Sequence, residues 1–176
     1  MTIRIGISGW RYAGWRQHFY PVGLPQKHEL AFASRALPTI EINGSHYALQ
    51  SPTSYRVWHD VTPDNFLFSV KAPRYVTHVL RLRGNECEIA IANFMASGLF
   101  NLGSKLGPIL WQFPPSMRLD FAVFERFLRM LPHDTEQASH LAKRHDHHVR
   151  HPCVQPVAAQ RIRHAVEIRH VSFCTA

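Results

Sequence analysis

Hydrophobic and polar residues alternate along several short stretches of the chain, a pattern typical of β-strands with one apolar face. The clearest case is residues 39–43, where Ile40 and Ile42 alternate with Thr39, Glu41 and Asn43. Strands are also indicated at residues 3–10, 66–71, 108–113 and 164–170. We therefore expect five strands, most of them ended by glycine or proline.

Apolar residues at helical spacing separate these strands. They predict helices at residues 26–36, 52–62, 86–102 and 121–131, and a short helix at 135–143. Ser51 and Asp120 stand where helix N-caps are expected. Strand followed by helix, four times and then one more strand, indicates parallel strands joined by crossover helices.

Polar side chains recur near the carboxyl ends of the predicted strands. They are Ser8, Glu41, Asn43, Ser69, Lys71, Gln112, Glu167 and Arg169. In a (β/α)8 barrel these ends line the active site, and alternate side chains point into the lumen. A doubly wound open sheet is the alternative, but residues 6–9 lack its dinucleotide-binding glycine pattern. The pattern therefore favours an α/β protein of TIM-barrel type.

Several motifs in this order resemble one known family. They are Gly6-Ile7-Ser8-Gly9-Trp10, Phe19-Tyr20-Pro21, Val22-Gly23-Leu24-Pro25, Glu41-Ile42-Asn43-Gly44-Ser45-His46-Tyr47, Phe68-Ser69-Val70-Lys71-Ala72-Pro73-Arg74, Trp111-Gln112-Phe113-Pro114-Pro115 and Glu167-Ile168-Arg169-His170. Together they resemble the domain of unknown function 72 family, also called YecE-like, over residues 3–133 and 164–173. The resemblance implies a barrel of the (β/α)8 type and no established activity.

The chain is shorter than a complete barrel, which takes about 250 residues and eight strands. With 176 residues and about five βα strands, we expect one domain over residues 1–176 that forms an incomplete TIM barrel, as in a truncated or frameshifted form. The histidine-rich residues 135–163 depart from the family pattern. They are expected to be an insertion or a linker within that domain.

Composition narrows the classes of protein further. No apolar run approaches the roughly 20 residues that span a bilayer, and residues 1–4 lead into a strand without a signal-peptide core, so a cytoplasmic location is expected. Cys87, Cys153 and Cys174 are too few and too far apart for a disulfide framework or a zinc site. The formal net charge of +8 favours anionic partners, either phosphorylated small molecules or nucleic acid.

The polar strand ends suggest a chemistry. Two carboxylates across the mouth of a barrel can act as general acid and base, and two nearby cations can hold an anionic group. We therefore predict catalytic roles for Glu41, Lys71 and Glu167. Predicted substrate-binding residues are Ser8, Trp10, Asn43, Arg74, Gln112 and Arg169. The alternative is that the charged groups form a buried ion network with no catalytic role.

Basic and aromatic residues also fill the loops after the first and third strands. They are Arg11, Arg16, Arg74, His78 and Arg81, with Trp10, Tyr12, Trp15 and Tyr75 among them. Such a rim suits phosphate binding and stacking on sugars or bases. Three hypotheses follow: an enzyme that uses acid/base chemistry on an anionic or sugar-like small molecule, a non-catalytic nucleic-acid-binding protein, and an inactive truncated chain.

No metal or cofactor is expected. Five histidines of the 135–163 segment invite a metal assignment, namely His140, His145, His147, His148 and His151. Their spacing matches no zinc finger, and no helical pattern gives them a common face. Outside that segment, His46 follows Asn43-Gly44 and is expected to face the mouth.

Overall fold

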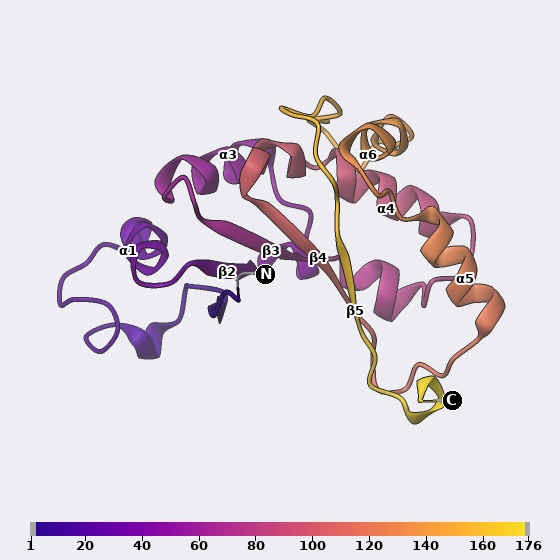
Figure 1. Ribbon diagram of the computed structural model, residues 1–176, viewed down its shortest axis with the longest axis horizontal. Coiled ribbons are helices and arrows are strands. Elements are labelled where there is room, and N and C mark those ends of the chain that lie inside the picture. The colour runs from indigo at the N-terminus through magenta and orange to yellow at the C-terminus, as the bar shows by residue number, and fades with distance from the viewer. Residues whose placement is uncertain (1–2, 175–176) are drawn as a thin grey trace.

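The computed structural model describes residues 3–174 and contains one parallel five-stranded sheet (Figure 1). The strands are β1 (Ile7–Ser8), β2 (Thr39–Ile42), β3 (Leu67–Lys71), β4 (Leu106–Gln112) and β5 (His164–Glu167), and they lie side by side in chain order. Every neighbouring pair is parallel. The order β1-β2-β3-β4-β5 is that of consecutive βα units in a TIM-type barrel.

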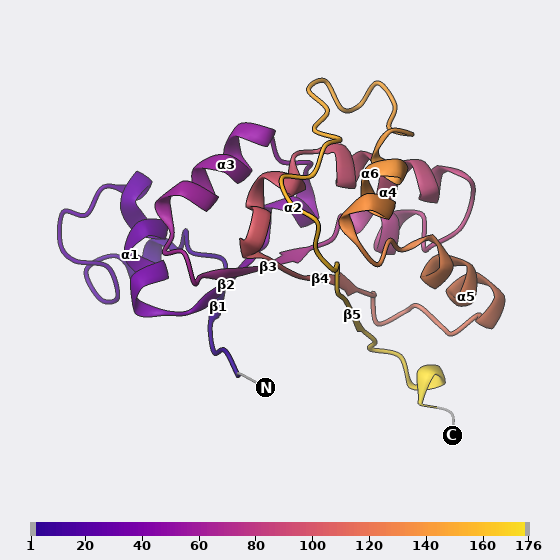
Figure 2. The same cartoon turned by 45° about the horizontal axis from the view of Figure 1, so that its top comes forward.

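Helices connect the strands. They are α1 (Glu29–Ala36), α2 (Gly44–Tyr47), α3 (Pro52–Val61), α4 (Glu86–Ala96), α5 (Phe121–Met130) and α6 (Thr135–Ala142). Figure 2 shows α3, α4 and α6 on one side of the sheet. None of the helices within residues 3–174 is both long enough and apolar enough to cross a membrane.

The alternation of side chains explains why α3, α4 and α6 pack on that face. Ile40, Phe68 and Trp111 are fully buried on the covered side, and the residues that follow Ile40 and Trp111 in their strands, Glu41 and Gln112, are partly exposed on the other. One apolar and one polar face per strand produce a sheet with a single covered side. The predicted α/β fold is confirmed, and its arrangement is that of an incomplete barrel.

Helix N-caps form where the sequence indicated them. The Ser51 side chain accepts a hydrogen bond from the backbone N–H of Ser54 at 3.1 Å. At the start of α5, Asp120 accepts from the N–H of Val123 at 3.2 Å. A third cap was not predicted: Asp134 accepts from the N–H of Gln137 at the start of α6. Each cap satisfies an amide that the helix itself leaves unpaired.

The first strand is much shorter than predicted. Pairing is confined to Ile7 and Ser8, and the side chains of Ile3 and Ile5 are 86% and 75% exposed. Gly9 adopts φ 76°, a left-handed conformation that ends the strand immediately. Alternation alone predicted eight residues because it cannot show how far a partner strand extends.

The predicted helix at residues 86–102 is broken. The helix α4 ends at Ala96, Gly98 takes φ 115°, and a tighter 3₁₀ segment follows at Leu99–Lys105. Glycine is required at this break, since a Cβ atom on Gly98 would lie 2.4 Å from the Cα atom of Pro52. The apolar spacing continues through the break, which is why the pattern predicted one helix.

The histidine-rich segment contacts the rest of the fold. Its helix α6 packs against α4. Beyond α6, the amide of Asn93 donates to Asp146 at 3.0 Å, and the N–H of Cys153 donates to the carbonyl of Ala96 at 2.8 Å. Arg144 forms an ion pair with Glu88. Residues 135–153 are therefore attached to α4 at several points along its length.

Candidate functional site

The first two strands carry a connected group of polar side chains on the uncovered face. Ser8 and Glu41 are partners across the β1–β2 ladder, and the Ser8 hydroxyl donates to Glu41 Oε1 at 2.7 Å. The Asn43 side-chain amide donates to the Ser8 oxygen at 2.6 Å. The structure therefore joins three of the predicted site residues through one hydroxyl.

A second polar group lies across the last two strands. Gln112 and Glu167 pair across the β4–β5 ladder, and the Gln112 amide donates to Glu167 Oε2 at 2.6 Å. Arg169 Nε donates to the other carboxylate oxygen at 2.5 Å. Burial alone would raise the pKa of Glu167, but these two hydrogen bonds and the charges of Arg169 and Lys71 outweigh it and hold that pKa below its ordinary value. Glu167 is therefore a carboxylate at neutral pH.

Two histidines lie in the segments that follow β2 and β3. His46, in α2, is buried, and its Nδ1 atom is 2.8 Å from the carbonyl oxygen of Ala72. Its ring contacts the ring of His78. Burial lowers the pKa of His46, and the charges of Lys71 and Arg74 lower it further, against the opposing effects of the Ala72 hydrogen bond and Glu41.

His78 has a lowered pKa for similar reasons. Burial is the largest cause, followed by the nearby His46, Arg74, Arg169 and Lys71. Both imidazoles are thus neutral at pH 7 and available as proton acceptors. The cations that act on them are three of the predicted site residues, so the structure brings the Lys71, Arg74 and Arg169 charges to the same end of the sheet.

The Trp10 ring is not part of the polar groups at the strand ends. The predicted substrate-binding role is not supported for its ring, which is only 8% exposed and packs edge to face against Trp58 of α3 at 5.5 Å. Its carbonyl accepts a hydrogen bond from the Tyr20 hydroxyl at 2.6 Å. Its size and apolar character favour the core on the helical side of the sheet. The roles of the other predicted site residues stay predictions.

The basic rim is partly used for structure. Arg16 pairs with the fully buried Glu29 at 2.9 Å, and Arg81 donates to Ser116. Arg11 and Arg74 remain exposed. The rim is therefore less continuous than the sequence suggested, because two of its arginines hold loops together.

A cavity opens beside His46. Its volume is about 790 Å³, and it is bounded by α2, the turn at residues 73–79, α4 and residues 146–148. His46 and Arg74 line it together with the apolar side chains of Leu49, Val79 and Ile89. The sequence suggested that His46 faces the mouth, but the pairing with His78 and this cavity depend on contacts between loops that no local pattern encodes.

One group of side chains within residues 3–174 has ligand atoms spaced for a metal ion. Asp146, His147 and His148 each place one such atom within 4.8 Å of the others. Hydrogen bonds from the His148 N–H and from the His148 and Asn93 side chains lower the pKa of Asp146 to about 2, against the effect of burial. These bonds already use Asp146 Oδ1 to anchor the loop on α4. The absence of a metal cofactor stays a prediction.

Comparisons with known proteins identify the family. The sequence pattern of the family described as "Protein of unknown function DUF72" matches residues 4–176. The chain is 33% identical over 116 residues to the UPF0759 protein YunF of Bacillus subtilis, an alignment that covers 64% of this chain and 40% of YunF.

Solved structures agree with this match. The DUF72 family protein TM1631 of Thermotoga maritima superposes with a TM-score of 0.68 at 25% identity, over 98% of this chain and 58% of that one. The DUF72 family protein EF0366 of Enterococcus faecalis shares the fold, with a TM-score of 0.58 at 20% identity, over 74% of this chain and 49% of that one. The chain thus spans about two fifths to three fifths of the length of these relatives. The predicted resemblance is confirmed: this chain belongs to the DUF72 family.

Proposed function

We propose that this protein is an enzyme that binds a small anionic molecule at the carboxyl end of the sheet and acts on it by proton transfer. The supporting observation is the arrangement of the charges: His46 and His78 contact each other, Lys71 and Arg74 act on both rings, and Arg169 acts on His78. Cations that face neutral bases attract an anion and leave a proton acceptor beside it.

The two predicted catalytic carboxylates, Glu41 and Glu167, have different surroundings. Glu167 is held ionised by Gln112 and Arg169, so it orients the Arg169 guanidinium toward a bound anion. Glu41 accepts from Ser8 through Oε1, which leaves its second oxygen to exchange a proton with the substrate. Unequal surroundings are what allow two carboxyl groups to take different roles.

A nucleic-acid surface is the weaker alternative. Stacking on bases requires exposed aromatic rings beside arginines. Trp10 is buried, and Arg16 and Arg81 are engaged with Glu29 and Ser116. Arg11, Tyr12 and Tyr75 remain exposed, but they offer a smaller surface than the sequence indicated.

A ligand screen tests the proposal. The melting temperature of the purified chain is measured with a panel of sugar phosphates, carboxylic acids and neutral sugars, and hits are assayed for turnover. We expect an anionic compound to stabilise the wild type and Arg129→Gln, a variant that loses an exposed arginine on α5, but not Arg169→Gln. Glu41→Gln is expected to retain binding and lose turnover.

Two results would contradict this proposal. The first is that no anion depends on Arg169 for binding. The second is that a turned-over compound reacts equally fast with Glu41→Gln. Circular dichroism of each variant separates loss of binding from loss of fold.

A further inference from the structure

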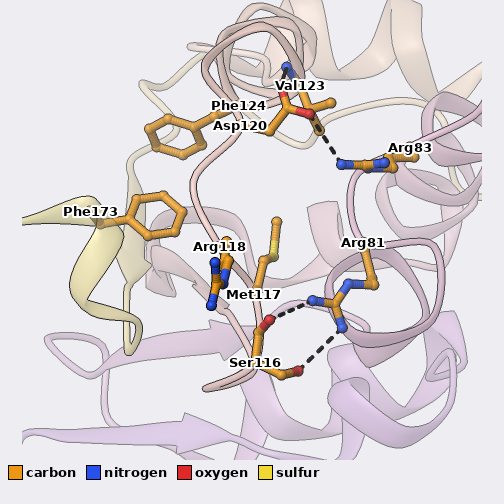
Figure 3. A pocket seen from close by; sticks show the side chains of 9 residues that line it. All are labelled: Arg81, Arg83, Ser116, Met117, Arg118, Asp120, Val123, Phe124 and Phe173. Atoms are coloured by element: carbon orange, nitrogen blue, oxygen red, sulfur yellow. Dashed lines mark hydrogen bonds and ion pairs between the residues drawn. The ribbon is translucent and has the colours of Figure 1, made fainter.

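A second, separate pocket lies between the loop that precedes α4, the loop between β4 and α5, and the turn at Val171–Phe173 (Figure 3). Its volume is about 200 Å³. Of the residues that line it, Arg81 was considered above as part of the basic rim, and none is among the predicted catalytic or substrate-binding residues. Its lining residues are Arg81, Arg83, Ser116, Met117, Arg118, Asp120, Val123, Phe124 and Phe173.

The charge of this pocket is strongly positive. Three arginines and one carboxylate, that of Asp120, line it, and Arg83 pairs with Asp120 at 3.1 Å. Arg118 has no hydrogen bond or ion pair with the other side chains of the pocket in Figure 3. Each arginine carries five N–H donors, so Arg81 and Arg83 retain donors beyond those that their present partners use. An anion with several acceptor oxygens would complement this arrangement.

The three segments that form the pocket are joined to one another. Arg81 donates to the carbonyl and hydroxyl of Ser116 at 2.8 and 3.2 Å, and Arg83 bonds Asp120. The N–H of Leu119 donates to the hydroxyl of Ser172 at 2.8 Å. These bonds fix Arg81, Arg83 and the segment that carries Arg118 before any ligand arrives, which lowers the entropy cost of binding.

The backbone that presents Arg81 is strained. Arg81 and Leu82 have φ values of 51° and 64°, a left-handed conformation that costs energy for residues other than glycine. Leu82 is fully buried, and its carbonyl accepts a hydrogen bond from Arg126 at 3.2 Å, so packing maintains the conformation. Backbone strain of this kind tends to cluster at active sites, ligand clamps and switch regions.

The walls limit what the pocket can hold. Phe124 and Phe173 meet edge to face with centroids 5.6 Å apart. They form an apolar wall across from Arg81 and Arg83, and Arg118 lies beside Phe173 (Figure 3). The volume is below the range of about 300–1,000 Å³ that is usual for whole drug-sized ligands. A phosphoryl group with a compact apolar body fits, and a nucleotide does not.

We propose that this pocket binds the dianionic phosphoryl group of a small phosphate monoester through Arg81, Arg83 and Arg118, with the apolar part of the ester against Phe124 and Phe173. The pocket is independent of the proposed anion site at the carboxyl ends of the strands, which we call the strand-end site. It is a binding site, and no reaction is assigned to it.

Phenyl phosphate and inorganic phosphate are the probes that test this inference. Binding to the purified full chain is measured by isothermal titration calorimetry at constant ionic strength. We expect saturable binding of both, with phenyl phosphate tighter because its ring replaces water on the phenylalanines. Arg118→Gln should weaken both by about tenfold or more, as expected for loss of a charge-assisted hydrogen bond. Arg118→Lys, which keeps the charge, should weaken them less.

Control variants identify the site. Arg129→Gln removes an equal charge from an exposed position on α5 and should leave both affinities unchanged. Arg169→Gln alters the strand-end site, so comparing it with Arg118→Gln distinguishes binding there from binding in this pocket. The inference is overturned if the wild type shows no saturable binding, if Arg118→Gln weakens binding no more than Arg129→Gln, or if binding is lost in Arg169→Gln and retained in Arg118→Gln. Should Arg118→Gln fail to fold, Arg118→Lys carries the same comparison.

Discussion

The imidazole rings of His46 and His78 meet edge to face, with their centroids 5.3 Å apart and their planes at 81°. His46 comes from α2, which follows β2, and His78 comes from the turn after β3. Both have lowered pKa values because of burial and because nearby cations, Lys71 and Arg74 among them, disfavour the protonated form. A proton on either ring would therefore be opposed by the charges of Lys71 and Arg74, and a proton on both rings would add repulsion between them.

This pair predicts that stability falls with mild acid. A histidine whose folded-state pKa is lowered contributes stability that is complete above its unfolded pKa of about 6.5 and is lost as the pH drops through the folded value. Urea unfolding of the wild type between pH 7.5 and 5.5 should show this loss. His78→Gln should show a shallower dependence, and equal slopes would contradict the prediction. The window stays above the range in which the carboxylates titrate.

Gly98 is predicted to be indispensable for the break after α4. Gly98→Ala would place a Cβ atom 2.4 Å from the Cα atom of Pro52 at φ 115°. We expect a loss of about 2 kcal/mol or more in the free energy of unfolding. Gly14→Ala is the matched control, since nothing lies within 4 Å of its Cβ position. Urea denaturation of both variants checks this, and similar midpoints would show that the backbone adjusts.

Lys105 is predicted to stabilise the end of α3. Its side chain is buried, and Nζ donates to the carbonyls of His59 and Thr62 at 2.5 and 2.8 Å. Lys105→Met would leave both carbonyls without this donor, at a cost of about 1–3 kcal/mol. The exposed Lys27→Met serves as control in the same denaturation experiment. An unchanged or higher stability would mean that burying the ammonium costs as much as its hydrogen bonds return.

The cap of α6 gives a prediction for the histidine-rich segment. Asp134 accepts from the N–H of Gln137 at 2.8 Å, so Asp134→Ala should destabilise the chain by about 1 kcal/mol. Asp134→Asn preserves a capping oxygen and should cost much less. Thermal denaturation distinguishes the two. Equal losses would indicate that the charge, rather than the cap, is what matters.

The sequence alone was enough to predict the features of the fold that depend on local patterns. Alternation at residues 39–43 predicted both strand β2 and the face that Glu41 occupies, because a strand has a side-chain period of two. Proline, glycine and capping residues similarly located α3 and α5. The approach of the strand ends followed from parallel topology, which the repeated strand-and-helix order implied.

Contacts between distant loops could not be predicted in this way. The short helix α2 and the His46–His78 contact depend on how two loops meet. The burial of the Trp10 ring against Trp58 likewise depends on where α3 lies. The joining of Arg81 to Ser116 spans 35 positions and leaves no periodic signal. Such features depend on tertiary packing, which overrides local preference.

The sheet is covered on one face, and this has an electrostatic consequence for the other. The hydrogen bond between Ser8 and Glu41 and that between Glu167 and Arg169 are both exposed, so water surrounds these groups on the uncovered side. Bulk water screens charges strongly, and the same groups would exert much larger forces in a dry environment. A ligand that displaces this hydration would therefore strengthen every attraction that holds it, and affinity should rise steeply with the fraction of the polar face that the ligand covers.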